Sequence, residues 1–326
     1  MNFDLTKQQI ELRERVRDFA EREVRPVAAY NDENEIFDVE LTRKMADLGL
    51  LGICVPKAYG GQELDTLSYI IAVEELSRVD GSTAATIAAD NSLGISPIKE
   101  YGTKEQKEKY LPLLCKTHLW GFGLTEETAG CDSRGTKSTA RLEDDKWVLN
   151  GTKIFITNSA TPMTLGSTVQ VVSGEKNGKP EFTTFLMEND TPGFTQEPMN
   201  RKMMWRASNT GRLTFNNVEL TNDNMLGAPG QGSHIMLATL DGGRLSIAAM
   251  ALGCAQGAYE MALAYSKERE QFGKQICKFQ AVSFKLADMA MKIEAARCLL
   301  YKACRIKDAG MPLAKKQPWR NSIVLR

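Results

Sequence analysis

Two short polar segments combine residue types that suit the binding of a planar, polar ligand. The first, Leu124–Asp132, is a glycine-containing loop that follows a short apolar run. The second, Lys153–Asn158, reads as a strand that ends in a hydroxyl and an amide. Such segments can present backbone N–H groups and short side chains to a ligand. Glu126, Glu127 and Asp132 could form a carboxylate cluster, although a solvated acidic loop is the simpler interpretation.

Other common chemistries have no sequence signal in this chain. There is no Gly-x-Gly-x-x-Gly after a strand, no phosphate-binding Walker loop and no Gly-x-Ser-x-Gly elbow. The two histidines, His118 and His234, are too few for a histidine-based metal site, and we predict no metal. The seven cysteines lie far apart without a Cys-x-x-Cys pair, which predicts free thiols in a reducing cytoplasm.

Length and composition are ordinary for a globular protein. The 326 residues allow two or three domains, with 42% apolar and 25% charged residues. The 41 basic and 41 acidic residues cancel, so nothing favours nucleic acid or an anionic membrane surface as a partner. We find no apolar run long enough to cross a bilayer and therefore expect a cytoplasmic protein.

The first 120 residues carry helix signals. Thr6-x-x-Gln9 is a capping-box pattern that marks the start of a helix. Pro26 should end or bend this helix. Thr103 is a candidate N-cap for a later helix. The further predicted helices span Val39–Leu51, Leu67–Arg78 and Lys104–Leu114.

From residue 121 the pattern changes to strands and then back to helices. We predict a hairpin that turns at Asn150-Gly151 and another that turns at Asn177-Gly178, because these dipeptides suit a type I′ turn. The strands continue to about Gly227. Apolar residues between Val282 and Leu300 recur every three or four positions, as in a helix that packs against another helix. The predicted fold class is α+β: an N-terminal helical domain (1–120), a middle antiparallel β-domain (121–228) and a C-terminal helical bundle (229–326), which we expect to be incomplete.

Seven motifs, spread over almost the whole chain in the order that the family has them, resemble those of the acyl-CoA dehydrogenase family. The first is Phe122-Gly-Leu124-Thr125-Glu126-x-x-Ala129-Gly130-Cys131-Asp132, in which the family usually has serine in place of Cys131. The others are Tyr59-Gly60-Gly61, Tyr101-Gly102-Thr103-x-x-Gln106, Asn150-Gly151-x-Lys153, Trp205-Arg206-x-Ser208-x-Thr210, Leu240-Asp241-Gly242-Gly243-Arg244 and Arg269-x-Gln271-Phe272-Gly273. The resemblance is closest to the short-chain, butyryl-CoA dehydrogenase-like branch.

The resemblance implies FAD as the cofactor and assigns residues to it. Thr125 should bond the pyrimidine end of the isoalloxazine, and Thr157 should donate near flavin N5. Cys131, Asp241 and Arg244 should contact the acyl-CoA, while Arg269, Phe272 and Gln280 should reach the FAD of a neighbouring subunit. The full set of implied cofactor-binding residues is Phe122, Leu124, Thr125, Gly130, Cys131, Phe155, Ile156, Thr157, Arg269, Phe272 and Gln280. Phe155 as a plain core residue and Arg244 as a surface ion pair remain alternatives.

The implied reaction is α,β-dehydrogenation of an acyl-CoA thioester in fatty acid metabolism. A glutamate removes the α proton while the β hydrogen leaves as hydride to the flavin, and the electrons pass to an electron-transferring flavoprotein. The family resemblance also implies a homotetramer. An acyl-CoA oxidase is a weaker alternative, which peroxide production in air would reveal.

The catalytic glutamate that the family implies has no match in this chain. In most branches it lies in a late Tyr-Glu-Gly-Thr context, which does not occur here. In a minority it precedes the arginine of the Leu-Asp-x-x-Arg motif, where this chain has Gly243. We therefore assign no catalytic residue and keep a catalytically impaired flavin- or CoA-binding remnant as the alternative function.

Residues 317–326 resemble no helix of the family, and a frameshift would explain them. Deleting the first G from GCA GCC ATG GCG AAA CTC TAT TGT TCT GAG, one encoding of a family-like helix, yields codons for residues 317–325. We therefore expect a frameshift truncation that removes the base and the helices that cover the 282–300 seam. Resequencing the gene would test this expectation.

Overall fold

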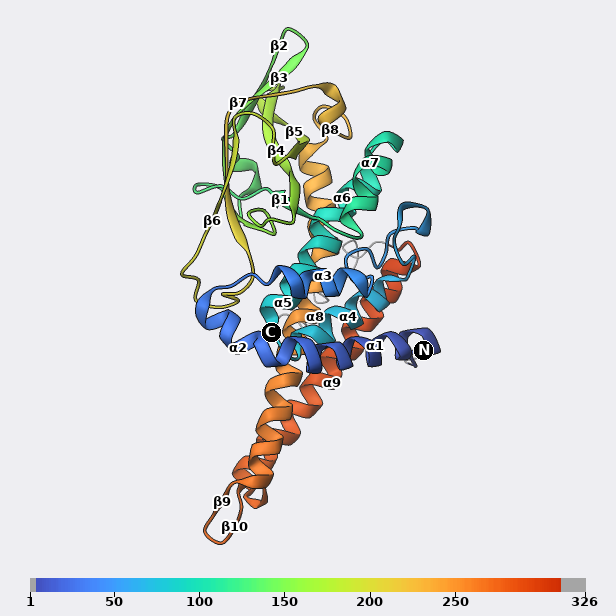
Figure 1. Cartoon of the computed structure of the whole chain (residues 1–326), viewed down its shortest axis with the longest axis vertical. Helices are drawn as coiled ribbons and strands as arrows, with labels where there is room; N and C mark the ends of the chain where they lie inside the picture. The colour runs from blue at the N-terminus through green and yellow to red at the C-terminus, as the bar shows by residue number, and fades with distance from the viewer. Residues whose placement is uncertain (1–3, 312–326) are drawn as a thin grey trace. The chain divides into compact units, whose positions relative to one another are not determined.

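The computed structural model describes residues 4–311, so the expectation for residues 317–326 lies outside the described part. Contacts divide the chain into two units. The sheet unit comprises Ala29–Leu64 and Ala85–Gly243. The helical unit takes the chain up to Ala28, Asp65–Ala84 and everything from Arg244. Along the chain the fold is α+β, helical at both ends with strands in the middle, as predicted (Figure 1).

The eight-stranded sheet forms the middle of the chain and is coloured green to yellow in Figure 1. Its strand order is β6-β7-β3-β2-β4-β5-β8, and β1 pairs with β4. The strands are β1 (Leu119–Gly123), β2 (Thr139–Glu143), β3 (Lys146–Thr157), β4 (Thr164–Lys176), β5 (Lys179–Glu188), β6 (Phe194–Pro198), β7 (Thr210–Leu220) and β8 (Met225–Leu226). The predicted antiparallel arrangement holds for most pairs, but β1 and β2 both run parallel to β4.

The hairpin predicted at Asn150-Gly151 is wrong. Both residues lie inside the continuous strand β3, and the turn between β2 and β3 is made by Asp144 and Asp145 with φ of 46° and 66°. Gly151 is instead a point of close approach, since a Cβ there would lie 2.3 Å from Ser138 Oγ. A glycine inside a strand therefore marks an irregularity in the ladder rather than its end.

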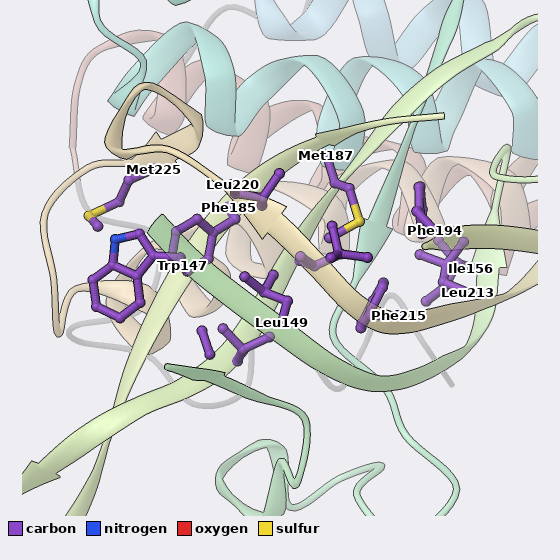
Figure 2. Packing of buried hydrophobic residues seen from close by; sticks show 14 residues of the cluster. Trp147, Leu149, Ile156, Phe185, Met187, Phe194, Leu213, Phe215, Leu220 and Met225 are labelled. Carbon is purple, nitrogen blue, oxygen red and sulfur yellow. The ribbon is translucent and has the colours of Figure 1, made fainter. Parts of the chain in front are cut away.

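The second predicted hairpin is confirmed. Asn177 and Gly178 connect β4 and β5 with φ of 54° and 71°. The sheet carries a cluster of buried apolar side chains, which Figure 2 shows as sticks. This cluster comprises Ala140, Trp147, Leu149, Ile156, Val169, Val171, Phe185, Met187, Phe194, Leu213, Phe215, Val218, Leu220 and Met225.

The helices of the sheet unit are short and begin at recognisable caps. Thr103 and Gln106 form a capping box at the start of α7, which confirms the predicted N-cap. Asp38 caps α3, which ends at Asp47, four residues earlier than predicted. The helical segments are α3 (Val39–Asp47), η2 (Lys57–Tyr59), α5 (Gly81–Ala89, which begins in the helical unit), η3 (Asp90–Ile95), α6 (Ser96–Tyr101), α7 (Lys104–Leu114), η4 (Ser133–Gly135) and η5 (Asn222–Asn224).

The helical unit contains the longest elements. They are α1 (Lys7–Phe19), η1 (Ala20–Val24), α2 (Arg25–Asn34, which continues into the sheet unit), α4 (Thr66–Ser77), α8 (Gly232–Glu268, which begins in the sheet unit), β9 (Glu270–Gln271), β10 (Lys274–Gln275), η6 (Ile276–Lys278) and α9 (Gln280–Asp308). The Thr6–Gln9 capping box is confirmed. Pro26 does not end the helix, because the π-helical turn η1 precedes it and the chain continues as α2.

Helices α4, α8 and α9 pack closely. A Cβ at Gly257 of α8 would lie 2.1 Å from the Arg78 carbonyl, so the two backbones touch only because the residue is glycine. Leu286, Ile293 and Leu300 of the predicted seam are buried. Contrary to our expectation from the sequence, α8 is long and apolar enough to cross a membrane by length and composition alone, although 61% of that stretch is buried in the fold.

Candidate functional site

Strand β1 ends in an apolar wall. Phe122 and Leu124 are 8% and 7% exposed and form a buried cluster with Met236 from the start of α8. Leu93 and Leu240 pack against this cluster and are themselves only partly buried. The sheet unit therefore has a largely buried apolar cluster, here called the apolar wall, beside the polar loop that follows β1.

Strand β3 presents its end to the same loop through a bulge. Its ladder with β7 is irregular between Lys153 and Ile156, where Phe155 adopts φ of 60°. Such a backbone is unfavourable for an aromatic residue, and strain of this kind clusters at functional sites. The Ile154 N–H donates to the Thr125 carbonyl over 2.9 Å, which fixes the bulge beside the loop.

The bulge turns the Phe155 ring outwards. It is 62% exposed, although Ile154 and Ile156 on either side are buried. The alternative that Phe155 is a core residue is therefore wrong. A strained segment that exposes an aromatic ring suits the face of a planar ligand, and this observation fits an isoalloxazine.

A buried ion pair lies at the base of the loop. Lys153 is fully buried and its Nζ lies 2.7 Å from Glu126 Oε1. The carboxylate also accepts from Lys137 N at 2.7 Å and from Ser138 N and Oγ at 3.1 and 2.7 Å. Burial acts to raise the pKa of Glu126, but the Lys153 charge and these hydrogen bonds outweigh it and hold the pKa below its usual range.

The proposed carboxylate cluster is therefore neither a simple solvated loop nor a free acid–base group. Glu126 is engaged by Lys153, and Glu127 forms an exposed ion pair with Arg212 at 2.8 Å. Asp132 Oδ1 accepts from the Arg134 N–H at 3.2 Å. All three carboxylates thus have partners within the sheet unit.

The remaining loop and strand candidates divide into accessible and buried residues. Gly130 and Cys131 are exposed at the loop tip, and Thr125 and Thr157 are half-buried. The Ile156 side chain packs in the sheet core beside Leu213 and Phe194, so only its backbone could face a cofactor (Figure 2).

Asn158, the amide that ends the second segment, does not face a ligand. It is fully buried, and its Nδ2 donates to the Thr86 carbonyl over 2.9 Å. The sequence pattern identified Asn158 as a polar residue at the end of the segment. It could not reveal its hydrogen bond to Thr86, which is 72 residues away along the chain.

The Leu-Asp-x-x-Arg motif lies on α8, where Asp241 and Arg244 are exposed and Gly243 is buried. A Cβ at Gly243 would lie 3.1 Å from Leu93 Cδ2, so this position adjoins the apolar wall. Arg244 belongs to the helical unit.

The late candidates lie at the connection between α8 and α9 in the helical unit, with Arg269 and Phe272 at the β9–β10 hairpin and Gln280 as the first residue of α9. Phe272 is 94% exposed with φ of 53°, and Arg269 and Gln280 are also exposed. The Arg269 carbonyl accepts from the Ile276 N–H at 2.9 Å, which closes the hairpin (Figure 1). An exposed aromatic and a guanidinium at a hairpin tip suit contact with another molecule.

Sequence reasoning missed the pairing of Lys153 with Glu126. Both residues belong to motifs that resemble those of the family, but the sequence suggested only that Glu126 is part of an acidic loop. The available signal was a lysine directly before the buried strand residues Ile154 and Ile156, because a charge at such a position needs a partner.

Three family models match this chain in succession. They describe the N-terminal domain of acyl-CoA dehydrogenase over residues 6–118, its middle domain over 121–218 and its C-terminal domain over 230–318. Together they cover most of the chain.

Known proteins show the same similarity. A short-chain specific acyl-CoA dehydrogenase of Clostridium acetobutylicum is 46% identical over 313 residues, which are 96% of this chain and 82% of that protein. The butyryl-CoA dehydrogenase structure from Megasphaera elsdenii aligns with a TM-score of 0.93 at 42% identity, covering 99% of this chain and 84% of that one. A structure described as an electron transferring flavoprotein of Acidaminococcus fermentans, studied for flavin-based electron bifurcation, aligns with a TM-score of 0.94 at 43% identity and the same coverage.

Proposed function

Because this chain belongs to the acyl-CoA dehydrogenase family, we propose that it oxidises short-chain acyl-CoA thioesters at the α,β bond and passes the electrons to an electron-transferring flavoprotein. The family comprises oxidoreductases that act on CH–CH bonds and use FAD. The short-chain preference is supported by the names of the C. acetobutylicum and M. elsdenii relatives. The electron acceptor is supported by the description of the A. fermentans structure.

The observation that carries this proposal is the bulge of β3 beside the loop after β1. The exposed Phe155 ring supplies an apolar face, and the Ile154–Thr125 hydrogen bond holds the loop next to it. Thr125 and Thr157, both half-buried, supply hydroxyl and backbone groups for the polar edge of a flavin. This combination of an aromatic face and polar edges is the environment that an isoalloxazine needs.

FAD, when bound, supplies the acceptor for the hydride that leaves the β-carbon. The chain's own residues bind and orient the substrate. The apolar wall of Phe122, Leu124 and Met236 excludes water on one side of the site, and the Cys131 thiol at the loop tip can contact the thioester. A thiol is a weaker hydrogen-bond partner than the family's serine, so Cys131→Ser should lower the Kd for butyryl-CoA a few-fold.

Removal of the α proton needs a base, and the described site supplies none at the position that the resemblance indicates. Gly243 has no side chain, and Glu126, Glu127 and Asp132 are each engaged by other groups. This observation favours a second candidate function, a flavin- and CoA-binding protein that does not turn over. Both candidates require the same FAD and thioester site.

Anaerobic mixing of the FAD-loaded protein with butyryl-CoA separates the candidates. Bleaching of the visible flavin band, followed by reoxidation on adding electron-transferring flavoprotein, supports the dehydrogenase. A spectrum that shifts without bleaching supports the non-catalytic binding protein. Peroxide formation in air would identify an oxidase, and a protein that binds no FAD would contradict both candidates.

We also propose that the chain assembles as a homotetramer in which Arg269, Phe272 and Gln280 contact the FAD of a neighbouring subunit. The exposure of all three at the connection between α8 and α9 supports this proposal. Light scattering at several protein concentrations measures the assembly. Arg269→Ala should weaken FAD binding because a guanidinium suits phosphate oxygens. A strictly monomeric protein that binds FAD fully would contradict the proposal.

A further inference from the structure

The loop that follows β1 is attached to β3 by a buried charge pair, in addition to the hydrogen bond from the Ile154 N–H to the Thr125 carbonyl. Lys153 Nζ donates to Glu126 Oε1 at 2.7 Å and to the Leu124 carbonyl at 3.3 Å. A charge without solvent is tolerated only when it is paired and hydrogen-bonded. The lysine therefore joins β3 to the two residues that flank Thr125.

The Glu126 carboxylate connects the two ends of the loop. Both of its oxygens are occupied: Oε2 accepts from Lys137 N, and Oε1 accepts from Ser138 and Lys153. Lys137 and Ser138 lie where the loop returns to the sheet, just before β2. A single side chain thus closes a loop of about a dozen residues, for which closure otherwise costs chain entropy.

Further contacts hold the rest of the loop: Glu127 forms an exposed ion pair with Arg212, and the Ser133 carbonyl accepts from Gln170 Nε2 at 3.1 Å. Glu126 and Ala129 exchange two backbone hydrogen bonds of 3.0 and 3.2 Å, which form a tight turn directly after the carboxylate. Beyond this turn, Gly130 and Cys131 are exposed, and a Cβ at Gly130 would meet nothing within 4 Å. At the base of the loop, the buried pair and this turn hold the residues on either side of the exposed tip.

We infer that Lys153 and Glu126 are positioning residues that hold the loop from Leu124 to Asp132 in its flavin- and thioester-binding conformation. This inference rests on the proposed FAD site for its function, but the loop geometry can be tested without FAD. Both side chains are buried, and they act through Thr125 and the turn at Ala129.

A set of three variants separates positioning from simple core stability. Glu126→Gln keeps the shape of the side chain but places an amide NH2 group among the hydrogen-bond donors that surround the carboxylate. It also leaves Lys153 buried without its partner charge. The double variant Glu126→Leu with Lys153→Met removes both charges, which commonly restores stability when a buried pair is replaced. Arg212→Gln is the matched control, because it breaks the neighbouring but exposed Arg212–Glu127 pair.

Two measurements on the full chain are needed. Hydrogen exchange of the apoprotein should quicken at least about tenfold for amides of residues 125–132 in both Glu126 variants, with β4 and β5 unchanged. The Kd for FAD should rise at least about tenfold in both, including the double variant after its thermal stability has recovered. The Arg212→Gln control should stay within about twofold of the wild type in both measurements.

The inference is overturned if the double variant folds with unchanged loop exchange and binds FAD like the wild type, since the pair would then serve core stability alone. If neither Glu126 variant folds, Ser138→Ala removes one donor to the carboxylate and keeps both charges. It should quicken exchange in the same loop, and unchanged exchange would overturn the inference. A wild-type protein that binds no FAD, yet shows the predicted loop exchange in the variants, would refute the proposed function and not the loop attachment.

Discussion

Gly243 is the residue at which the described site departs most from what the reaction needs. A Cβ at this position would lie 3.1 Å from the end of the flexible Leu93 side chain, which needs to move by only a few tenths of an ångström to admit it. Gly243→Glu should place a carboxylate beside the apolar wall, where burial raises its pKa towards the working pH. We predict that it accelerates flavin bleaching by butyryl-CoA at least about a hundredfold. Stopped-flow absorbance measures this rate.

Gly243→Gln is the matched control, because it has nearly the same shape and cannot accept the α proton. Equal bleaching rates in the glutamate and glutamine variants would show that this position does not reach the substrate's α-carbon.

Glu21 is a single residue whose ionisation should couple folding to pH. Hydrogen bonds from Arg25, and further ones from Arg78, lower the pKa of Glu21 from 4.5 to about 2 in the folded protein. Its stabilisation is therefore complete above about pH 4.5 and disappears as the pH falls from 4.5 to about 2. Glu21→Gln should lower the free energy of unfolding at pH 7, and the difference from the wild type should shrink over that acid range.

Urea unfolding at several pH values measures this difference. Because Glu21 is partly exposed, added salt should reduce the effect. Asp18→Asn in the exposed Asp18–Arg22 pair is the control and should change stability little. A Glu21→Gln penalty that is constant between pH 7 and pH 2 would contradict the assignment.

The bulge of β3 combines an unfavourable backbone conformation with an exposed aromatic ring. Phe155 has φ of 60° and exposes most of its ring, so its side chain contributes little burial. Phe155→Gly should relieve the backbone and leave the apoprotein as stable as the wild type or up to about 1 kcal/mol more stable. The same change should raise the Kd for FAD at least about tenfold.

Asp145→Gly is the control for backbone relief, since Asp145 has φ of 66° in the β2–β3 turn. It should change stability similarly and leave FAD binding unaltered. A large loss of stability in Phe155→Gly would mean that the ring supports the fold.

The crossing of α8 over α4 depends on glycine at the contact. Gly257→Ala would place a methyl 2.1 Å from the Arg78 carbonyl, so the helices must separate. We predict a loss of about 1–3 kcal/mol in the free energy of unfolding, measured by urea denaturation. Ala258→Val, which enlarges the exposed neighbour, should cost far less. Similar losses in both variants would argue against the close crossing.

At the scale of the whole molecule, local signals predicted the elements well. The capping box at Thr6, the N-cap at Thr103 and the turn at Asn177-Gly178 are confirmed, because each depends on interactions within a few residues. The hairpin at Asn150-Gly151 is wrong, because Gly151 is a point of close approach to Ser138, which directly precedes β2. The outward Phe155 ring and the Lys153–Glu126 pair likewise depend on contacts between distant segments, which no local pattern contains.

The family resemblance supplied the candidate residues, and the structure shows which of them share an environment. Phe122, Leu124 and Thr125 come together with the bulge of β3 in the sheet unit. Ile156, which the resemblance assigned to the cofactor, and Asn158, the amide at the end of the segment, are buried in the fold.

The location of the flavin site is tested most directly by hydrogen exchange of the full chain with and without FAD. We predict that FAD slows exchange in residues 125–131 and 154–157 while leaving the β4–β5 hairpin turn at Asn177-Gly178 unchanged. Binding of FAD with protection confined to other segments, or no binding at all, would contradict the site.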